Sequence, residues 1–72
     1  MTTKVKIVGH NRAVRALLKA GFKVVREGRK HTIMFKDDVF LSIPRHNPLK
    51  RYTLEGIVKD SDLSFKEFND LL

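Results

Sequence analysis

The chain has 72 residues, of which 42% are hydrophobic, with no cysteine and a formal net charge of +7. This composition is typical of one small globular domain spanning residues 1–72, and it excludes disulfide bonds and thiolate metal sites. No apolar run approaches the roughly 20 residues of a membrane span, and Lys4 and Lys6 interrupt any signal-peptide pattern. We therefore expect a cytoplasmic protein that does not associate with membranes.

The charge is unevenly distributed along the chain. Residues 1–52 contain thirteen Lys/Arg and three Asp/Glu, whereas residues 53–72 contain two and five. A basic body with an acidic end indicates a surface suited to polyanions such as nucleic acids. The alternative is that the chain, like many small basic proteins, binds nothing specific.

A helix is predicted first, after an extended lead-in. Asn11 can cap its N-terminus, since its side-chain oxygen can accept from a free backbone N–H of the first turn. Val14, Leu17 and Leu18 follow at helical spacing and predict one apolar stripe. Gly21 is expected to end the helix in the left-handed conformation.

Three strands are expected next, over residues 22–26, 31–36 and 39–43. A glycine turn joins the first two, and Asp37-Asp38 suits a two-residue hairpin because aspartate tolerates turn dihedrals. Pro44 ends the third strand, since it has no N–H to donate. The centre of the chain is therefore predicted to be a three-stranded antiparallel meander.

Two further helices are predicted towards the C-terminus. Thr53 can cap the first, in which Leu54, Ile57 and Val58 share one face. The segment from Ser64 to Glu67 is a capping-box pattern that opens a last short helix. The fold class is α+β: helix, three-stranded antiparallel sheet, helix and a short C-terminal helix.

Alternation along the strands predicts which face the helices cover. The more apolar set is expected to lie under the helices, and it comprises Ile33, Phe35, Leu41 and Ile43. This leaves three apolar residues on the open face: Val25, Met34 and Phe40. They are either ordinary surface scatter or a docking patch for a partner.

The turn from Glu27 to His31 carries the chemistry that the sequence makes most visible. Histidine can give and take a proton near neutrality, and this one follows Arg29 and Lys30. A proton shuttle beside anion-binding cations suits reactions of phosphodiesters. By alternation, however, His31 is expected on the face of the core, where a structural histidine is the competing interpretation unless a bulge turns it outward.

Other candidate sites are weaker. His10, His31 and His46 show none of the close spacings of zinc sites, so no metal or other cofactor is expected. Arg45-His46 is a second possible phosphate contact, and a solvated polar loop is the alternative.

Taken together, these pieces resemble the HicA family of toxins from bacterial and archaeal toxin–antitoxin pairs. The resemblance covers about residues 4–72. It is carried, in order, by residues 17–22 (LLKAGF), Val25-Arg26, the turn reaching His31, residues 43–46 (IPRH), Thr53-Leu54, Ile57-Val58, Leu63-Ser64 and Glu67-Phe68.

The resemblance implies a double-stranded-RNA-binding-domain-like fold, messenger RNA cleavage and neutralisation by a HicB antitoxin. It also implies that His31 is catalytic, because the interval from Phe22 to the histidine matches the family. The chain departs from the family in its turn: Arg29-Lys30 stands where Gly-Ser is common, and its glycine, Gly28, comes one residue earlier. This departure bears on the turn geometry and on RNA preference.

The predicted function is metal-independent endoribonuclease activity with His31 as the catalytic residue. The residues expected to bind RNA phosphates are Arg26, Arg29, Lys30, Arg45, His46, Lys50 and Arg51. The main alternative is a non-catalytic double-stranded-RNA-binding module, which needs the same basic face but no histidine. A DNA-binding regulator ranks below both.

Overall fold

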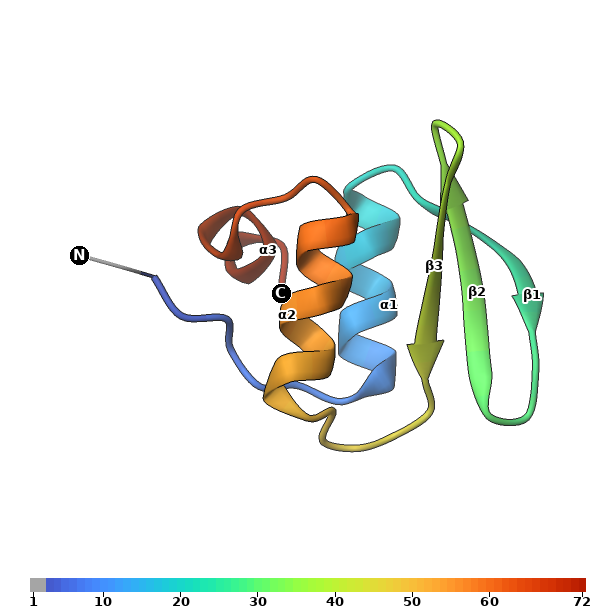
Figure 1. The fold of residues 1–72 in the computed structure, drawn as a ribbon, viewed down its shortest axis with the longest axis horizontal. Helices are drawn as coiled ribbons and strands as arrows, with labels where there is room; N and C mark the ends of the chain where they lie inside the picture. Colours follow the sequence, from blue (N-terminus) through green and yellow to red (C-terminus); the bar gives the residue numbers. More distant parts are fainter. Residues whose placement is uncertain (1–2) are drawn as a thin grey trace.

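Residues 3–72 are described by a computed structural model in which helices cover one face of a three-stranded antiparallel sheet (Figure 1). The elements are α1 (His10–Lys19), β1 (Lys23–Glu27), β2 (His31–Lys36), β3 (Val39–Pro44), α2 (Arg51–Asp60) and α3 (Phe65–Asp70). The predicted α+β, double-stranded-RNA-binding-domain-like order is confirmed.

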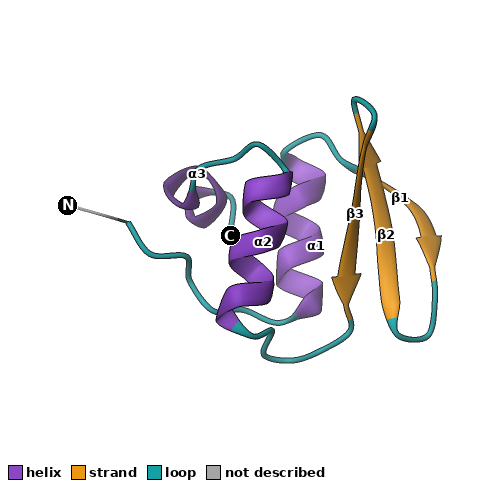
Figure 2. Ribbon diagram, in the orientation of Figure 1, coloured by secondary structure: helices purple, strands orange, loops and turns teal. Residues whose placement is uncertain are grey.

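The elements form successive layers (Figure 2). Helices α1 and α2 lie side by side against the sheet, whose strand order is β1-β2-β3, and α3 packs on α2 away from the sheet. The other face of the sheet is left uncovered. Within residues 3–72, no helix is both long enough and apolar enough to cross a membrane.

Helix α1 begins one residue before the predicted cap. Gly9 occupies the N-cap position without a side-chain hydrogen bond, so Asn11 lies inside the first turn. The buried face consists of His10, Ala13, Ala16 and Leu17, whereas Leu18 is 47% exposed, so its predicted place on the stripe was wrong. The predicted helix end is confirmed: Gly21 has φ of 101°.

Helix α2 also begins earlier than predicted, with Lys50 rather than Thr53 at the N-cap. Its predicted buried face of Leu54, Ile57 and Val58 is confirmed. The capping box of α3 is present as well: the Ser64 hydroxyl accepts from the Glu67 N–H at 3.0 Å, and the Ser64 N–H donates to the Glu67 carboxylate at 2.9 Å. The hydrogen bond from the Ser64 N–H, and after it the Ser64 side chain, stabilise the charged Glu67 carboxylate and lower the pKa of Glu67.

The hairpin between β2 and β3 has the predicted two-residue turn, with Asp37 and Asp38 at φ of 48° and 67°. This turn sets a register in which Met34 lies opposite Leu41 and Thr32 lies opposite Ile43. All four side chains are buried under the helices. Met34 is therefore a core residue, and its assignment to an exposed docking patch was wrong.

The same register corrects the predicted face of β2. Ile33 pairs with Ser42 and Phe35 pairs with Phe40, on the face that the helices leave uncovered. His31, two residues before Ile33, lies on that open face too. No bulge in β2 is needed to turn it outward; the irregularity in the sheet lies in β1, between Val24 and Arg26.

Candidate active site

His31 is the first residue of β2, directly after the turn that joins β1 to β2. The Gly28 N–H donates to the His31 carbonyl at 2.8 Å and closes this turn. The Arg45 N–H donates to the Lys30 carbonyl at 2.9 Å, so the chain leaving β3 stays beside the turn. Two backbone contacts thus place the cations of both segments around one histidine.

The imidazole of His31 is exposed, and among residues 3–72 it makes no hydrogen bond to another side chain or to the backbone. A ring in this state can accept or donate a proton to a bound molecule. The geometric condition for a proton-transfer role, access from solvent, is therefore met.

Two shallow concavities meet at His31 and share Lys30. One is lined by Arg29, Lys30, His31, Pro44, Arg45 and His46. The other lies on the open face of the sheet and is lined by Arg26, Gly28, Lys30, His31, Ile33 and Ser42. The structure thus brings five of the predicted phosphate-binding residues around the histidine, and neither concavity contains a carboxylate in its lining.

Arg45 has a structural contact that the sequence did not predict. Its Nε donates to the Gly28 carbonyl at 2.8 Å, and its guanidinium lies 4.0 Å from the Glu27 carboxylate. The side chain remains 34% exposed. Arg45 therefore braces the turn that carries Arg29 and Lys30 and is at the same time one of the residues that line the concavity.

Lys50 and Arg51 line neither concavity. Lys50 is exposed at the start of α2, and the Arg51 guanidinium donates to the Val5 carbonyl at 3.4 Å.

The apolar docking patch expected on the open face was to include Val25, Met34 and Phe40. Val25 and Phe40 are exposed, with exposed fractions of 53% and 66%.

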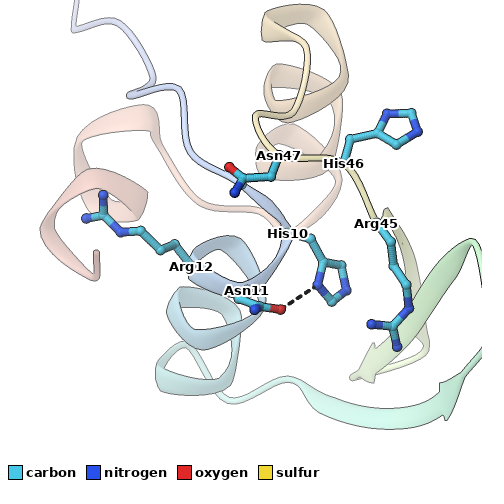
Figure 3. Close-up of a pocket in the computed structure, with 7 residues that line it drawn as sticks. His10, Asn11, Arg12, Arg45, His46 and Asn47 are labelled. Carbon is cyan, nitrogen blue, oxygen red and sulfur yellow. Dashed lines mark hydrogen bonds between the residues drawn. The ribbon is translucent and has the colours of Figure 1, made fainter.

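The loop after β3 is held against the start of α1 (Figure 3). The His10 N–H donates to the His46 carbonyl at 2.9 Å, and the Leu49 N–H donates to the Val8 carbonyl at 3.0 Å. Figure 3 shows that the loop residues Arg45, His46 and Asn47 border the same hollow as His10, Asn11 and Arg12. The position of Arg45 beside the β1–β2 turn thus depends on α1.

His10 is the residue near the site that the sequence argument missed. The residue is 9% exposed, with its ring Nδ1 at 2.9 Å from the Asn11 Oδ1 and Nε2 at 2.7 Å from the Thr32 hydroxyl. Because the amide oxygen can only accept, this pairing assigns the proton to Nδ1, and Nε2 accepts from Thr32. His10 therefore ties α1 to the strand residue that follows His31.

A sequence pattern could have pointed to His10. Thr32 follows His31, so the two side chains point to opposite faces of the sheet. In the hairpin register Thr32 lies on the face that the helices cover, where a buried hydroxyl needs a hydrogen-bond partner. His10 stands at the helix start, where it can supply one. In residues 3–72, no three His, Cys, Asp or Glu side chains gather as a metal-binding group.

Comparison with known proteins adds one finding. Residues 11–63 match a protein family described as the HicA toxin of bacterial toxin-antitoxin. This segment contains α1 from its second residue, the whole sheet and α2, and with them every residue that lines the two concavities at His31. The search of curated proteins and the search of solved structures gave no match.

Proposed function

The chain belongs to the HicA family of toxins from toxin–antitoxin systems, and from this premise we propose that it is an endoribonuclease that cleaves messenger RNA with His31 as its single catalytic histidine. The observation that carries the proposal is the exposed imidazole of His31, which has no hydrogen-bond partner among residues 3–72 and lies where two cation-lined concavities meet. We also propose that the protein acts in the cytoplasm, because its proposed substrate, messenger RNA, is found there.

The proposed reaction uses the 2′-hydroxyl of the RNA as nucleophile. The 2′-oxygen attacks phosphorus and the bond to the 5′-oxygen breaks, which leaves a 2′,3′-cyclic phosphate and a 5′-hydroxyl. His31 would take the proton of the 2′-hydroxyl or give one to the leaving oxygen, a role typically worth about 10²–10⁴-fold in rate. Water or a second group would complete the other proton transfer, and His46, which lines the same concavity as His31, is the candidate for that group.

The cations divide into two roles in this proposal. Arg29 and Lys30, on the turn next to His31, would hold the scissile phosphate and offset the charge that develops on it. Arg26, Arg45 and His46 would hold neighbouring phosphates. Lys50 and Arg51 would meet only a longer RNA that continues past the loop after β3.

Membership of this toxin family implies an antitoxin partner, and we propose a HicB-like protein in that role. An antitoxin that blocks cleavage must keep RNA from His31. An acidic surface would suit the concavities, whose linings contain cations and no carboxylate.

The deciding experiment replaces His31 and measures both cleavage and binding. We expect His31→Ala to lower the rate of RNA cleavage by at least about 10²-fold, because the proton shuttle is lost. RNA binding, measured by electrophoretic shift, should be retained because the cations remain. Cleavage by the unaltered protein should persist in EDTA and stop when the RNA has a 2′-deoxy substitution at the cut site.

Lys59→Ala, on α2 and outside both concavities, is the matched control and should cleave RNA normally. Undiminished cleavage by His31→Ala would refute the assignment.

The second candidate is a non-catalytic double-stranded-RNA-binding module, favoured by the fold class itself. This function requires the basic surface but not the histidine. Labelled RNA incubated with the protein in EDTA separates the two: fragments support the nuclease, and a shift without fragments supports the binding module.

A further inference from the structure

The open face of the sheet has a composition that the proposed reaction alone does not explain. By register, its residues are Lys23 and Arg26 on β1, His31, Ile33 and Phe35 on β2, and Phe40, Ser42 and Pro44 on β3. None of these is a carboxylate, and two are cations. The face therefore combines apolar surface with positive charge and continues directly from His31.

Phe40 is the most exposed of these apolar side chains, at 66%. Its ring lies against Phe35, with centroids 4.7 Å apart and planes inclined at 49°. Phe35 is only partly exposed, so it supports the Phe40 ring from the neighbouring strand. A supported ring that presents much of its surface to solvent is a ready stacking surface.

We propose that this face is a platform for single-stranded RNA, on which an unpaired base stacks on Phe40 while a phosphate of the same strand lies at His31. Phe35 follows His31 by four positions on β2, or about 13 Å along the strand, so base and scissile phosphate belong to different nucleotides. Arg26, opposite Ile33, lies between these two points and can hold the intervening backbone. This inference rests on the proposed function and names its substrate class.

Charge and continuity favour RNA as the occupant of this face. The concavity formed by Arg26, Lys30, His31, Ile33 and Ser42 runs from the histidine along the open face as far as Ile33, two positions before Phe35 on the same strand and face. Aromatic rings with cations alongside are the usual means of binding single strands, because every base has a stacking face. A duplex cannot use Phe40 in this way, since its bases are already stacked.

The test exploits the absence of tryptophan from the chain. Phe40→Trp, made in the His31→Ala background so that RNA stays intact, places a single tryptophan at the stacking position, where it can be excited apart from Tyr52. We expect a single-stranded oligoribonucleotide to quench this fluorescence and a duplex of the same sequence to leave it largely unchanged.

A kinetic arm uses the active protein. Phe40→Ala should raise KM for a single-stranded oligoribonucleotide about tenfold while kcat stays nearly constant, since stacking binds substrate away from the reacting atoms. Phe40→Trp should keep the original KM. Tyr52→Ala, which removes a ring that is 71% exposed on α2, is the matched control and should change neither constant.

Absence of quenching, or an unchanged KM for Phe40→Ala, would overturn the platform. If Phe40→Ala instead weakens binding of a HicB-like antitoxin and leaves RNA kinetics alone, the face is a protein-docking patch. The two proposals fail separately: cleavage that survives His31→Ala removes the nuclease mechanism, whereas quenching by single strands would still establish the platform.

Discussion

The contact between His10 and Thr32 explains how a threonine comes to be fully buried under the helices. The hydroxyl donates to Nε2 of a ring whose other nitrogen is held by Asn11, so both polar side chains are satisfied in the core. Such a pair fixes the position of β2 relative to α1 more narrowly than apolar contacts do. Because Thr32 follows His31 directly, this contact also fixes the position of His31 at the start of β2.

Thr32→Val should lower the free energy of unfolding by about 1–3 kcal/mol, because the buried Nε2 of His10 loses its partner while the shape of the side chain is kept. Urea denaturation measures the change. Thr32→Ser, which keeps the hydroxyl, should lose less. Ser42→Val, exposed on the opposite face of the sheet, is the control and should stay within about 0.5 kcal/mol. A Thr32→Val protein as stable as the parent would show that the pair does not matter.

The error over the face of β2 has a physical origin at single residues. His31, Ile33 and Phe35 look more apolar than Thr32, Met34 and Lys36, so alternation alone favours the wrong set. Thr32 can be buried only because His10, 22 positions earlier, supplies a partner, and strand periodicity carries no information about it. The predicted Asp37-Asp38 turn already implied the correct register, with Met34 opposite Leu41.

At the scale of elements, local patterns predicted the number, order and type of helices and strands, since periodicity, glycines and the capping box act within a few residues. The starts of α1 and α2 were missed because neither N-cap residue, Gly9 or Lys50, uses its side chain to cap. The cluster of cations around His31 was predictable because its members lie in two short segments of the sequence, the turn before β2 and the loop directly after β3. The brace from Arg45 to Gly28 was not, because it joins separate segments.

Two glycines illustrate how the same residue type differs between elements. Gly56 lies within α2, and apart from its chain neighbours and the backbone of its own helix no atom of residues 3–72 lies within 4 Å of an added Cβ, whereas Gly21 ends α1 at φ of 101°. Gly56→Ala should raise the free energy of unfolding by up to about 1 kcal/mol, since alanine favours the helix. Gly21→Ala should lower it, because a Cβ strains the left-handed conformation.

Thermal unfolding of Gly56→Ala and Gly21→Ala tests both predictions: the midpoint temperature should rise for the first variant and fall for the second. A midpoint that falls for Gly56→Ala would show that the packing of α2 on its neighbours does not tolerate the change.

At the scale of the whole molecule, the cations that bear on RNA binding are those on the side of the sheet. The sheet and the loops at its ends carry the cations around His31, and among residues 3–72 no carboxylate lines either concavity there. On the far side of α2 (Figure 1), α3 includes Glu67 and Asp70, but Lys66 pairs with Asp70 at 2.9 Å and the Lys19 ammonium donates to the Leu71 carbonyl just after α3. The field around His31 therefore attracts a polyanion to this side of the sheet.

The position of these cations predicts a salt dependence that differs between the concavities at His31 and the rest of the surface. In the His31→Ala background, binding of a labelled single-stranded oligoribonucleotide should weaken linearly on a log–log plot against salt concentration, as phosphate contacts release counterions. Arg29→Gln should reduce the slope by about 0.7, the value for one contact to a single strand. Lys59→Gln removes the same charge from α2 and should leave the slope unchanged, because that residue lies outside both concavities at His31. Equal effects of the two substitutions, measured by fluorescence anisotropy, would mean that net charge alone draws RNA to the protein and that the cations around His31 form no specific path.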